Sequence, residues 1–427
     1  MAVIMLFSLL FLFIALTVPI GIALGLSTVL TLTFSTNINT MMVAQNAFTG
    51  LDSFPLMAIP FFILAGNLME HGGISRRILS FADSLVGFIT GGLAMVTTLS
   101  CMIFAAISGS GPATVSAIGS FMMPAMKRKG YDEGFAAALS AAAGSIGVII
   151  PPSIPFVIYA VATGSSISDL FLAGVIPGIL VGVALMTISY LTSKKHGWKG
   201  SGVKPSIKNV GQQLIKSFWA LLMPVIILGS IYASICTPTE AAVLGIVYAI
   251  IVGKFVYKEL EWKFIYKAVV DAALINGATS FMIGLSTSFA GYLTMAQVPV
   301  TVATMLTTVS NNPIIIMIII NIFLLIVGCF IDNISSCLIL APIFLPVVKS
   351  FGIDPVHFGI IMTLNLAIGF VTPPYGANLF VASAVGDVPF AKVAKNAIPL
   401  VLTMIVVLLL VTYVEPLSMT LVRLVSK

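Results

Sequence analysis

The stretch GSIGVIIPPSIPF, residues 144–156, places two adjacent prolines in the middle of an apolar run. The run is otherwise long enough to span a bilayer. A proline inside a helix removes one backbone hydrogen bond and clashes with the preceding turn, at a cost of about 3 kcal/mol. In lipid the freed carbonyls find no water, so such a break persists only where protein buries it or where it lines a cavity. Pro151 and Pro152 therefore predict a helix that is interrupted at membrane depth.

The composition is that of a membrane protein. Of the 427 residues, 59% are hydrophobic and only 8% are charged. A soluble protein of this size could not cover its surface with so few charges, and apolar runs long enough for a membrane helix recur along the whole length. The net charge of +6 comes from lysines in short loops, so it does not indicate nucleic-acid binding. We predict an all-α polytopic protein in a lipid bilayer, with no nucleic-acid partner.

The start of the chain and its cysteines add two expectations. Residues 1–21 lack the positive start and the small-residue cleavage site of a signal peptide, so we expect a first membrane span there. The cysteines have no metal-ligand spacing and at least three fall in apolar segments, so we expect neither zinc nor a structural disulfide. The four are Cys101, Cys236, Cys329 and Cys337.

The apolar runs divide into full-length spans and two pairs of half-length segments. The pairs are 91–107 with 112–126, and 313–331 with 334–348; their turns read SGSGP (108–112) and DNISS (332–336). We expect each pair to enter and leave the membrane on the same side as a re-entrant hairpin, and ordinary spans are the alternative. The other predicted spans are 2–18, 20–34, 54–70, 131–164, 170–193, 217–235, 239–256, 267–296, 355–386 and 396–421, with an amphipathic stretch at 74–87 and a shorter segment at 297–311.

The positive charges test this layout. Counting each pair as a hairpin places almost all of the 20 Lys and Arg residues on one side of the membrane; the exceptions are Lys349, Arg423 and Lys427. A layout that counts each pair as a single crossing would scatter these charges. Since positive residues mark the cytoplasmic side, we expect both termini to face outward.

The proline pair has a twin in GFVTPPYGANLF, residues 369–380. Pro151 and Pro152 recur as Pro373 and Pro374 after a shift of 222 residues (from 151 to 373), and the same shift lays SGSGP across the start of the DNISS turn, with Ser110 on Asp332. An odd number of crossings separates the two copies, so they would have opposite orientations. Inverted repeats with helices broken at matching positions are typical of secondary transporters, which bind their substrate where the breaks meet. Further matched pairs are Pro124 with Pro346, Gly130 with Gly352, Asp132 with Asp354, Gly147 with Gly369, Gly164 with Gly386 and Pro177 with Pro399.

Broken helices expose ends that can bind ligands. A helix N-terminus offers free N–H groups to a carboxylate, and a C-terminus offers carbonyls to a hard cation such as Na⁺. Each half of the chain supplies one hairpin turn and one broken helix. We therefore expect two cation sites with one substrate site between them.

Five stretches of the sequence carry a family resemblance: LDSFPLMAIPFFILAGNLMEHGGISRRI (51–78), ISGSGPATVSAIGSFMMPAMKRKGY (107–131), GSIGVIIPPSIPFVIYA (144–160), LILAPIFLPV (338–347) and GFVTPPYGANLFVA (369–382). Through them the sequence resembles the large membrane subunit of a tripartite ATP-independent periplasmic (TRAP) transporter over essentially its whole length. The resemblance implies a Na⁺-coupled importer in the bacterial inner membrane, in which one domain carries the site across the bilayer against a scaffold, as in an elevator. It also implies two partners, a periplasmic substrate-binding protein and a small four-helix membrane subunit, and organic-acid substrates such as dicarboxylates and sialic acids.

The elevator plan divides the chain into six segments. Scaffold helices and an arm would occupy 1–90 and again 217–311. Each half of the transport domain would contain one hairpin and one broken helix, at 91–165 and 312–387. Residues 166–216 would form a linking helix and a basic cytoplasmic loop, and 388–427 a C-terminal helix.

Hydroxyl and carbonyl oxygens suit a hard cation, so we assign both cation sites to the turns and breaks. Helix capping alone is the alternative reading of the same Ser, Gly and Pro residues. The first Na⁺ site would combine Ser108, Ser110, Gly111 and Pro112 of the first turn with Gly144, Ser145, Gly147, Pro151 and Pro152 of the facing break. The second would combine Asp332, Asn333, Ser335 and Ser336 with Gly369, Thr372 and Pro373.

Asp332 is the one carboxylate that we place deep in the membrane, where an unpaired charge costs roughly 2.5–3.5 kcal/mol. It would bind a cation, cap the half-helix that follows, or do both. Candidate substrate contacts are Ser153, Tyr375 and Asn378 after the proline pairs, with Thr114 and Asn333 from the turns; polar packing is the alternative for these residues.

Other classes of function fit the sequence less well. SGSGP is similar to the Gly-x-Ser-Gly of rhomboid proteases, but Ile107 and Ser108 occupy the Gly-x positions, and the three histidines (His71, His196 and His357) fall near predicted span ends, so we expect no enzyme. A channel is a further alternative, but paired broken helices with oxygen clusters favour a carrier. The closest alternative is a standalone Na⁺- or H⁺-coupled carboxylate symporter of the same superfamily.

Overall fold

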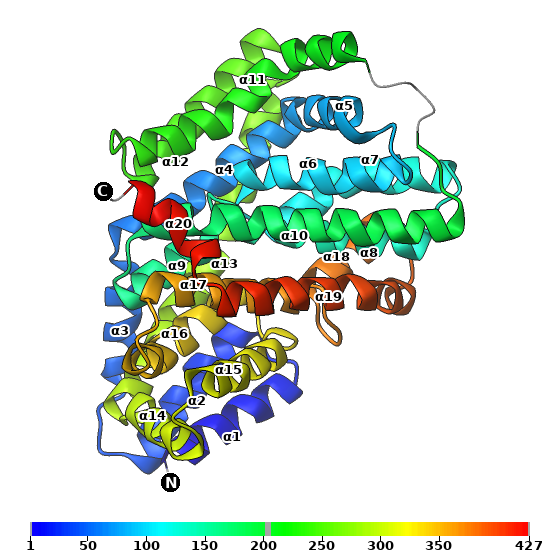
Figure 1. Cartoon of the computed structure of the whole chain (residues 1–427). Coiled ribbons are helices and arrows are strands. Elements are labelled where there is room, and N and C mark those ends of the chain that lie inside the picture. Colours follow the sequence, from blue (N-terminus) through cyan, green and yellow to red (C-terminus); the bar gives the residue numbers. More distant parts are fainter. Residues whose placement is uncertain (1, 201–205, 426–427) are drawn as a thin grey trace.

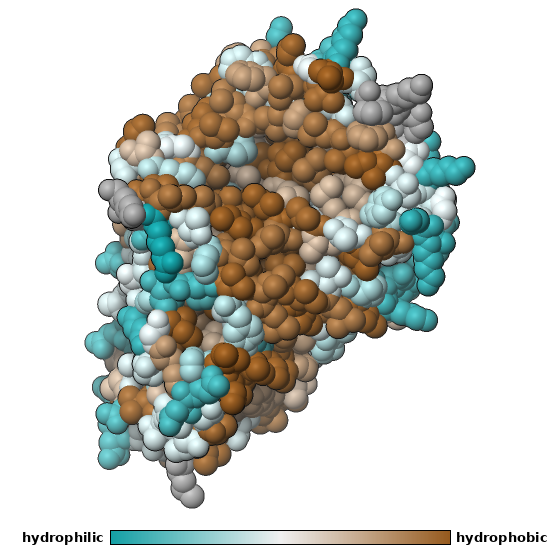
Figure 2. Space-filling view, viewed as in Figure 1, coloured by the Kyte–Doolittle hydropathy of each residue, from teal (hydrophilic) through white to brown (hydrophobic). Residues whose placement is uncertain are grey.

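The computed structural model describes residues 2–200 and 206–425, so Lys427 lies outside it; within these ranges the chain is helical and has no strand. Seven helices there are long and apolar enough to cross a membrane. Figure 1 shows α10 (Ile167–His196) and α19 (Phe390–Tyr413) running side by side across the fold. α6 (Gly92–Ser108) packs on α10 and on α7 (Gly111–Arg128). Figure 2 shows apolar side chains across the middle of this face and hydrophilic ones gathered at its two edges. This confirms an all-α polytopic architecture.

The first two helices form a short hairpin. α1 (Ala2–Ala15) and α2 (Ile20–Ser35) have 14 and 16 residues, so they extend about 21 and 24 Å, less than the ~30 Å hydrocarbon core of a bilayer. Gly21 and Gly25 of α2 lie against Met282 and Leu285 of α13 (Trp262–Met295). Both helices agree closely with the predicted segments 2–18 and 20–34, although each is shorter than the seven helices that are long enough to cross a membrane.

The segment after α2 contains a helix that the sequence analysis misses. α3 (Met41–Leu51) packs along α13, where the Ser288 hydroxyl donates to the Val43 carbonyl at 2.7 Å. A 3₁₀ turn (Phe54–Met57) leads into α4 (Ala58–His71), which confirms the predicted span 54–70, and the amphipathic stretch forms α5 (Ile74–Val86).

Both half-length pairs form helical pairs joined by tight turns. α6 and α7 meet at Gly109, whose φ of 61° lies in the left-handed region that glycine adopts readily. The second pair is α15 (Pro313–Gly328) and α16 (Asn333–Ser350). Both apolar runs with proline pairs are interrupted as predicted. The first consists of α8 (Glu133–Gly144), a 3₁₀ turn (Ser145–Val148) and α9 (Ile154–Thr163); the second consists of α17 (Pro355–Gly369) and α18 (Ala377–Gly386).

Two other predicted boundaries differ from the structure. α11 (Ile207–Tyr232) begins well before residue 217, so the predicted domain boundary at 216 falls inside a helix; the Ser206 side chain caps its start. The last predicted span, 396–421, is two helices, because Pro416 disfavours helical backbone at the residue before it and α20 (Pro416–Val425) starts anew. The remaining elements are α12 (Pro238–Ile251), a π-helical turn (Val252–Val256) and α14 (Val298–Val309).

The local structure repeats with the sequence. Shifting α7 by 222 residues gives the bounds of α16, and the residues that cap the two helices, Ser110 and Asp332, coincide. Asp132 and Asp354 cap α8 and α17 in the same way. Each break contains one cis Pro–Pro peptide, Pro151–Pro152 and Pro373–Pro374. The repeated motif is therefore a repeated backbone as well as a repeated sequence.

The two broken helices lie at the centre of the fold. Every residue of α8 from Gly134 to Gly144 is buried, and so is every residue of α17 from His357 to Gly369. The alanines and glycines of α8 leave little side-chain volume, which lets neighbouring helices approach closely. The helices that pack most closely against α8 are α6, α7, α18 and α19. This packing holds both breaks in the interior.

Candidate functional site

The two hairpin turns and the two breaks meet around a central cavity of about 700 Å³. This volume is in the range of small-molecule sites, about 300–1,000 Å³. The turns contribute residues 109–112 and 332–334, and the breaks contribute Val148, Phe370 and Tyr375. The cavity therefore lies where the sequence predicts a substrate site. Its remaining wall comes from Ile14, Thr17, Val18, Pro19, Ile20, Ile154, Pro155, Met282, Phe330 and Ala377.

The first turn packs tightly against the first break. The Thr114 hydroxyl donates to the Ser110 carbonyl at 2.8 Å and lies 2.8 Å from the Ser108 hydroxyl. A Cβ on Gly147 would lie 2.6 Å from both the Ser110 carbonyl oxygen and the Thr114 hydroxyl, so only glycine allows this approach. The Gly109 carbonyl accepts a hydrogen bond from the Ile154 N–H at 3.3 Å. The structure thus brings the residues predicted for the first Na⁺ site together.

The remaining members of that predicted set are close by. Gly144 packs on Val115 of α7, and the Pro152 carbonyl lies 2.9 Å from where a Cβ on Gly109 would stand. The Ser145 hydroxyl is buried and donates to the Ala142 carbonyl at 2.7 Å. Gly111 and Pro112 line the central cavity, while Pro151 is buried in the break.

The second turn contains buried polar atoms without partners. The Asp332 Oδ2 accepts from the backbone N–H groups of Ile334 and Ser335 at 2.9 and 3.1 Å, so it caps α16. Its other oxygen, Oδ1, is buried and has no hydrogen-bond partner among the described residues, and the same holds for the Asn333 Nδ2 and the Ser336 hydroxyl. Buried polar atoms are nearly always paired. The capping reading of Asp332 is confirmed, and its free oxygen fits a bound cation.

The second break contacts this turn through backbone atoms. A Cβ on Gly369 would collide with the Gly328 backbone at the end of α15. The Tyr375 N–H donates to the Cys329 carbonyl at 3.2 Å. The Thr372 hydroxyl donates to the Ile368 carbonyl at 2.8 Å and so retains lone pairs that can accept. Pro373 follows Thr372 in the non-helical segment of the break. Acidic clusters are not needed for such a site: the described residues contain no group of three His, Cys, Asp or Glu side chains that could hold a metal ion, but Na⁺ takes oxygen ligands of any kind.

The five predicted substrate contacts fall into two groups. Asn333 and Tyr375 line the central cavity, and Tyr375 is 45% exposed. Ser153 is fully buried; its hydroxyl donates to the Val148 carbonyl at 2.6 Å and caps α9. The Thr114 hydroxyl already donates to the Ser110 carbonyl within the first turn. The Asn378 amide donates to the Ala141 carbonyl at 3.1 Å and so joins the second break to α8.

The sequence analysis misses the part of the cavity wall formed by the α1–α2 turn. Thr17, Val18 and Pro19 at the tip of this hairpin line the central cavity. The Thr17 φ of 61° is unusual for a β-branched residue. The sequence does contain a signal for this turn, because Pro19 separates two apolar runs that are each short for a bilayer.

Comparison with known proteins identifies the family. The model of the family described as "Tripartite ATP-independent periplasmic transporter, DctM component" matches residues 7–417. The chain belongs to this family. It is similar to the isethionate TRAP transporter permease protein DctMQ of Oleidesulfovibrio alaskensis, with 48% identity over 97% of this chain and 65% of that protein, slightly less than two thirds of its length.

Other relatives match this TRAP permease over most of both chains. The C4-dicarboxylate TRAP transporter large permease protein DctM of Pseudomonas aeruginosa is 41% identical over 89% of this chain and 88% of its own. The sialic acid TRAP transporter large permease protein SiaM of Vibrio cholerae is 41% identical over 90% of this chain and 89% of its own. The crystal structure of the YdaH transporter of Alcanivorax borkumensis shares the fold, with a TM-score of 0.62 at 14% identity over 88% of each chain. The chain is thus a multi-pass inner-membrane protein whose relatives are permeases.

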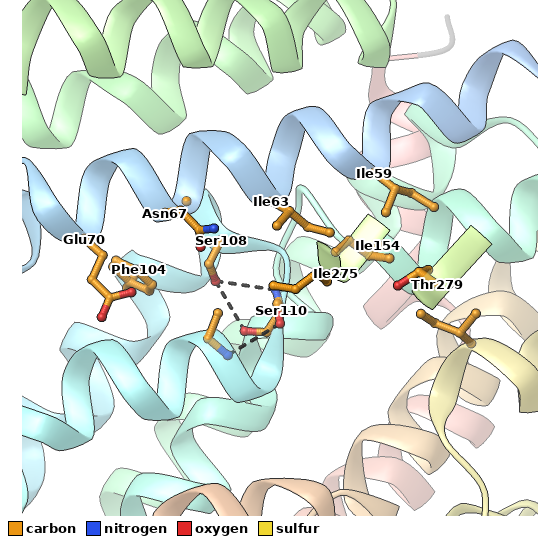
Figure 3. A pocket seen from close by; sticks show the side chains of 13 residues that line it. Ile59, Ile63, Asn67, Glu70, Phe104, Ser108, Ser110, Ile154, Ile275 and Thr279 are labelled. Carbon is orange, nitrogen blue, oxygen red and sulfur yellow. Dashed lines mark hydrogen bonds between the residues drawn. The ribbon is translucent and has the colours of Figure 1, made fainter. Parts of the chain in front are cut away.

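A second, smaller cavity of about 160 Å³ lies on the other side of the first turn of this TRAP permease. Figure 3 shows Asn67 and Glu70 of α4 and Thr279 of α13 around the hairpin that carries Ser108 and Ser110. Ser110, Ile154 and Ile334 line both cavities. These three residues therefore form a thin wall between the two spaces.

Proposed function

We propose that this TRAP permease imports an organic-acid anion, delivered by a periplasmic binding protein, together with Na⁺. The observation that carries the proposal is the set of unpartnered buried polar atoms at the second turn, Asp332 Oδ1 above all, beside the cavity where both turns and both breaks meet. An ionised carboxylate that is buried with one of its oxygens unpaired is costly. A bound Na⁺ would remove that cost.

The central cavity suits an anion held without a fixed positive side chain. No lysine or arginine appears among the described residues that line it. Two half-helices begin there instead, α7 at Gly111 and α16 at Asn333, and both residues line the cavity. Helix N-termini attract carboxylates through free N–H groups and the helix dipole. The relatives named for C4-dicarboxylate, sialic acid and isethionate support an acidic substrate for this chain.

The proposed mechanism is an elevator built on inverted repeats. The hairpins and broken helices, 91–165 and 312–387, would form the transport domain, and 1–90 with 217–311 the scaffold. The repeated backbone of α7 and α16 supports the repeat, and the charge distribution supports opposite orientations with both termini in the periplasm. Cysteine labelling of residues near each terminus with a membrane-impermeant reagent in intact cells tests the orientation, and protection of both would contradict it.

Asp332→Asn tests the cation site. Asparagine caps helices as well as aspartate does, so α16 should keep its start while the cation loses its carboxylate. We expect Na⁺-driven uptake into proteoliposomes to fall at least tenfold and to need more Na⁺ for half-saturation. Asp354→Asn is the matched control, because Asp354 caps α17 at the equivalent position but lines neither cavity. Unchanged Na⁺ dependence in Asp332→Asn would rule out direct coordination.

The alternative, a standalone symporter, differs in its partners. Purification of the tagged chain in mild detergent should recover the small membrane subunit at equal stoichiometry, and uptake should require the binding protein. A chain that purifies alone and takes up substrate without helpers would favour the alternative.

A further inference from the structure

A third cavity, of about 600 Å³, lies away from the transport site, between α5, α11 and the π-helical turn after α12. Most of its lining is polar or charged, including Arg76, Arg77 and Lys216. These belong to the side of the molecule that carries most of the Lys and Arg residues. Trp219 and Trp262 nearby are 42% and 70% exposed, as expected where a helix crosses a membrane interface.

The charges in this cavity do not cancel. Arg77 is fixed: its guanidinium donates to Glu259 at 2.8 Å and to the Gly73 carbonyl at 2.9 Å, and it stacks 3.6 Å over the Tyr257 ring. Arg76 is 3.9 Å from the same carboxylate, and its side chain is 69% exposed. Lys216 forms no ion pair with any described residue. One carboxylate therefore faces three cationic side chains, which leaves a surplus positive charge.

The surface next to the cavity is apolar. Ile215, Phe218 and Phe255 are 76%, 49% and 65% exposed, and Val256 belongs to the lining itself. A soluble anion would make no contact with these apolar side chains, but acyl chains in the adjacent leaflet would cover them. The combination of surplus positive charge and exposed apolar helices matches a lipid with an anionic headgroup, because basic cavities between helices on the positively charged side bind such headgroups.

We propose that this cavity binds the phosphate of an anionic phospholipid from the adjacent leaflet. Arg76 and Lys216 supply the donors that remain free, and Arg77 is held in place by Glu259 and Tyr257. A guanidinium group can donate two parallel hydrogen bonds to two oxygens of one phosphate, and the lysine adds a positive charge. The site is separate from the transport cavity and does not depend on the proposed function.

The double variant Arg76→Gln/Lys216→Gln tests the site. Native mass spectrometry of the purified transporter would measure binding of phosphatidylglycerol and, for comparison, phosphatidylcholine. Each Lys or Arg near the surface contributes about 1 kcal/mol to anionic-lipid attraction, so removing two should weaken phosphatidylglycerol binding about thirtyfold. Lys194→Gln/Lys195→Gln, which removes the same charge from the exposed last turn of α10, should leave it unchanged.

Two further measurements keep the result unambiguous. Thermal unfolding checks that the double variant is folded; Arg77 is left intact because its contacts hold the local structure. An excess of inorganic phosphate should fail to displace phosphatidylglycerol, since the acyl chains contribute to binding. Equal binding of the two lipids, unchanged binding in the double variant, displacement by phosphate, or exclusion of lipid by the co-purified small subunit would each overturn the proposal.

Discussion

Replacing Gly147 with alanine would test whether the contact between the first turn and the first break builds a cation site. The added Cβ would lie 2.6 Å from the Ser110 carbonyl oxygen and 2.6 Å from the Thr114 hydroxyl, closer than the 3.0 Å that real Cβ atoms essentially never pass. The turn must therefore move away from the break. Overpacking of this kind costs about 1–3 kcal/mol, and about 1.4 kcal/mol is a tenfold change in affinity. We expect the Na⁺ concentration for half-maximal uptake to rise roughly tenfold.

The assay is uptake into proteoliposomes over a range of Na⁺ concentrations, together with thermal unfolding of the purified protein with and without Na⁺. Gly277→Ala is the matched control, since nothing lies within 4 Å of a Cβ there and alanine favours the α13 helix. The control should keep its Na⁺ dependence. If Gly147→Ala shows the same Na⁺ dependence and the same stabilisation by Na⁺ as the unmodified protein, the contact does not build a cation site.

Three further predictions follow from contacts around the two cavities. A Cβ on Gly66 would lie 3.9 Å from that of Ser108, a distance suited to a disulfide, so Gly66→Cys/Ser108→Cys should cross-link on oxidation and stop transport until reduced; transport that continues after cross-linking would contradict the elevator. Ser153→Ala should lower the free energy of unfolding by about 1 kcal/mol, as for a lost helix cap, with Na⁺ dependence unchanged; a shifted Na⁺ dependence would make Ser153 a ligand. Thr17→Val should raise KM for the substrate about fivefold by removing a hydroxyl that lines the central cavity, worth about 1 kcal/mol. The Thr17 hydroxyl donates to the Leu16 carbonyl at 2.7 Å and keeps lone pairs that can accept; Thr33→Val, whose hydroxyl also donates to a local carbonyl but does not line the cavity, is the control, and an equal effect in both would exclude a role in the cavity.

The sequence predicts the turns and breaks well, because their prolines and glycines act directly on the backbone. The adjacent pair Pro151–Pro152 interrupts its helix, whereas a single proline such as Pro177 stays inside one. Gly147 is required by a contact that no other residue permits. The end of α1 is different, because the apolar run continues past Ala15 and nothing in the run itself marks where the helix stops. The local sequence likewise does not mark α3 or the position of Thr17 in the cavity wall.

Side-chain roles are less predictable than backbone breaks, because they depend on which partners are already taken. Ser153 and Ser336 both lie near the start of a half-helix, and the sequence does not distinguish them. The structure gives the Ser153 hydroxyl a carbonyl at 2.6 Å and leaves the Ser336 hydroxyl buried without a partner. A hydroxyl that is already bonded caps a helix, whereas a free one in the interior is available to a ligand.

The two halves of the site share a backbone but not a charge. Ser110 caps α7 where Asp332 caps α16, and the hydroxyls of the first turn bond to one another. Under the proposed function, a Na⁺ at the second site is neutralised by Asp332, whereas a Na⁺ at the first keeps its positive charge beside the cavity. An anionic substrate would then be attracted mainly by the first Na⁺ and by the helix N-termini. Substrate affinity should therefore depend more on occupancy of the first site than of the second, although only the second contains a carboxylate.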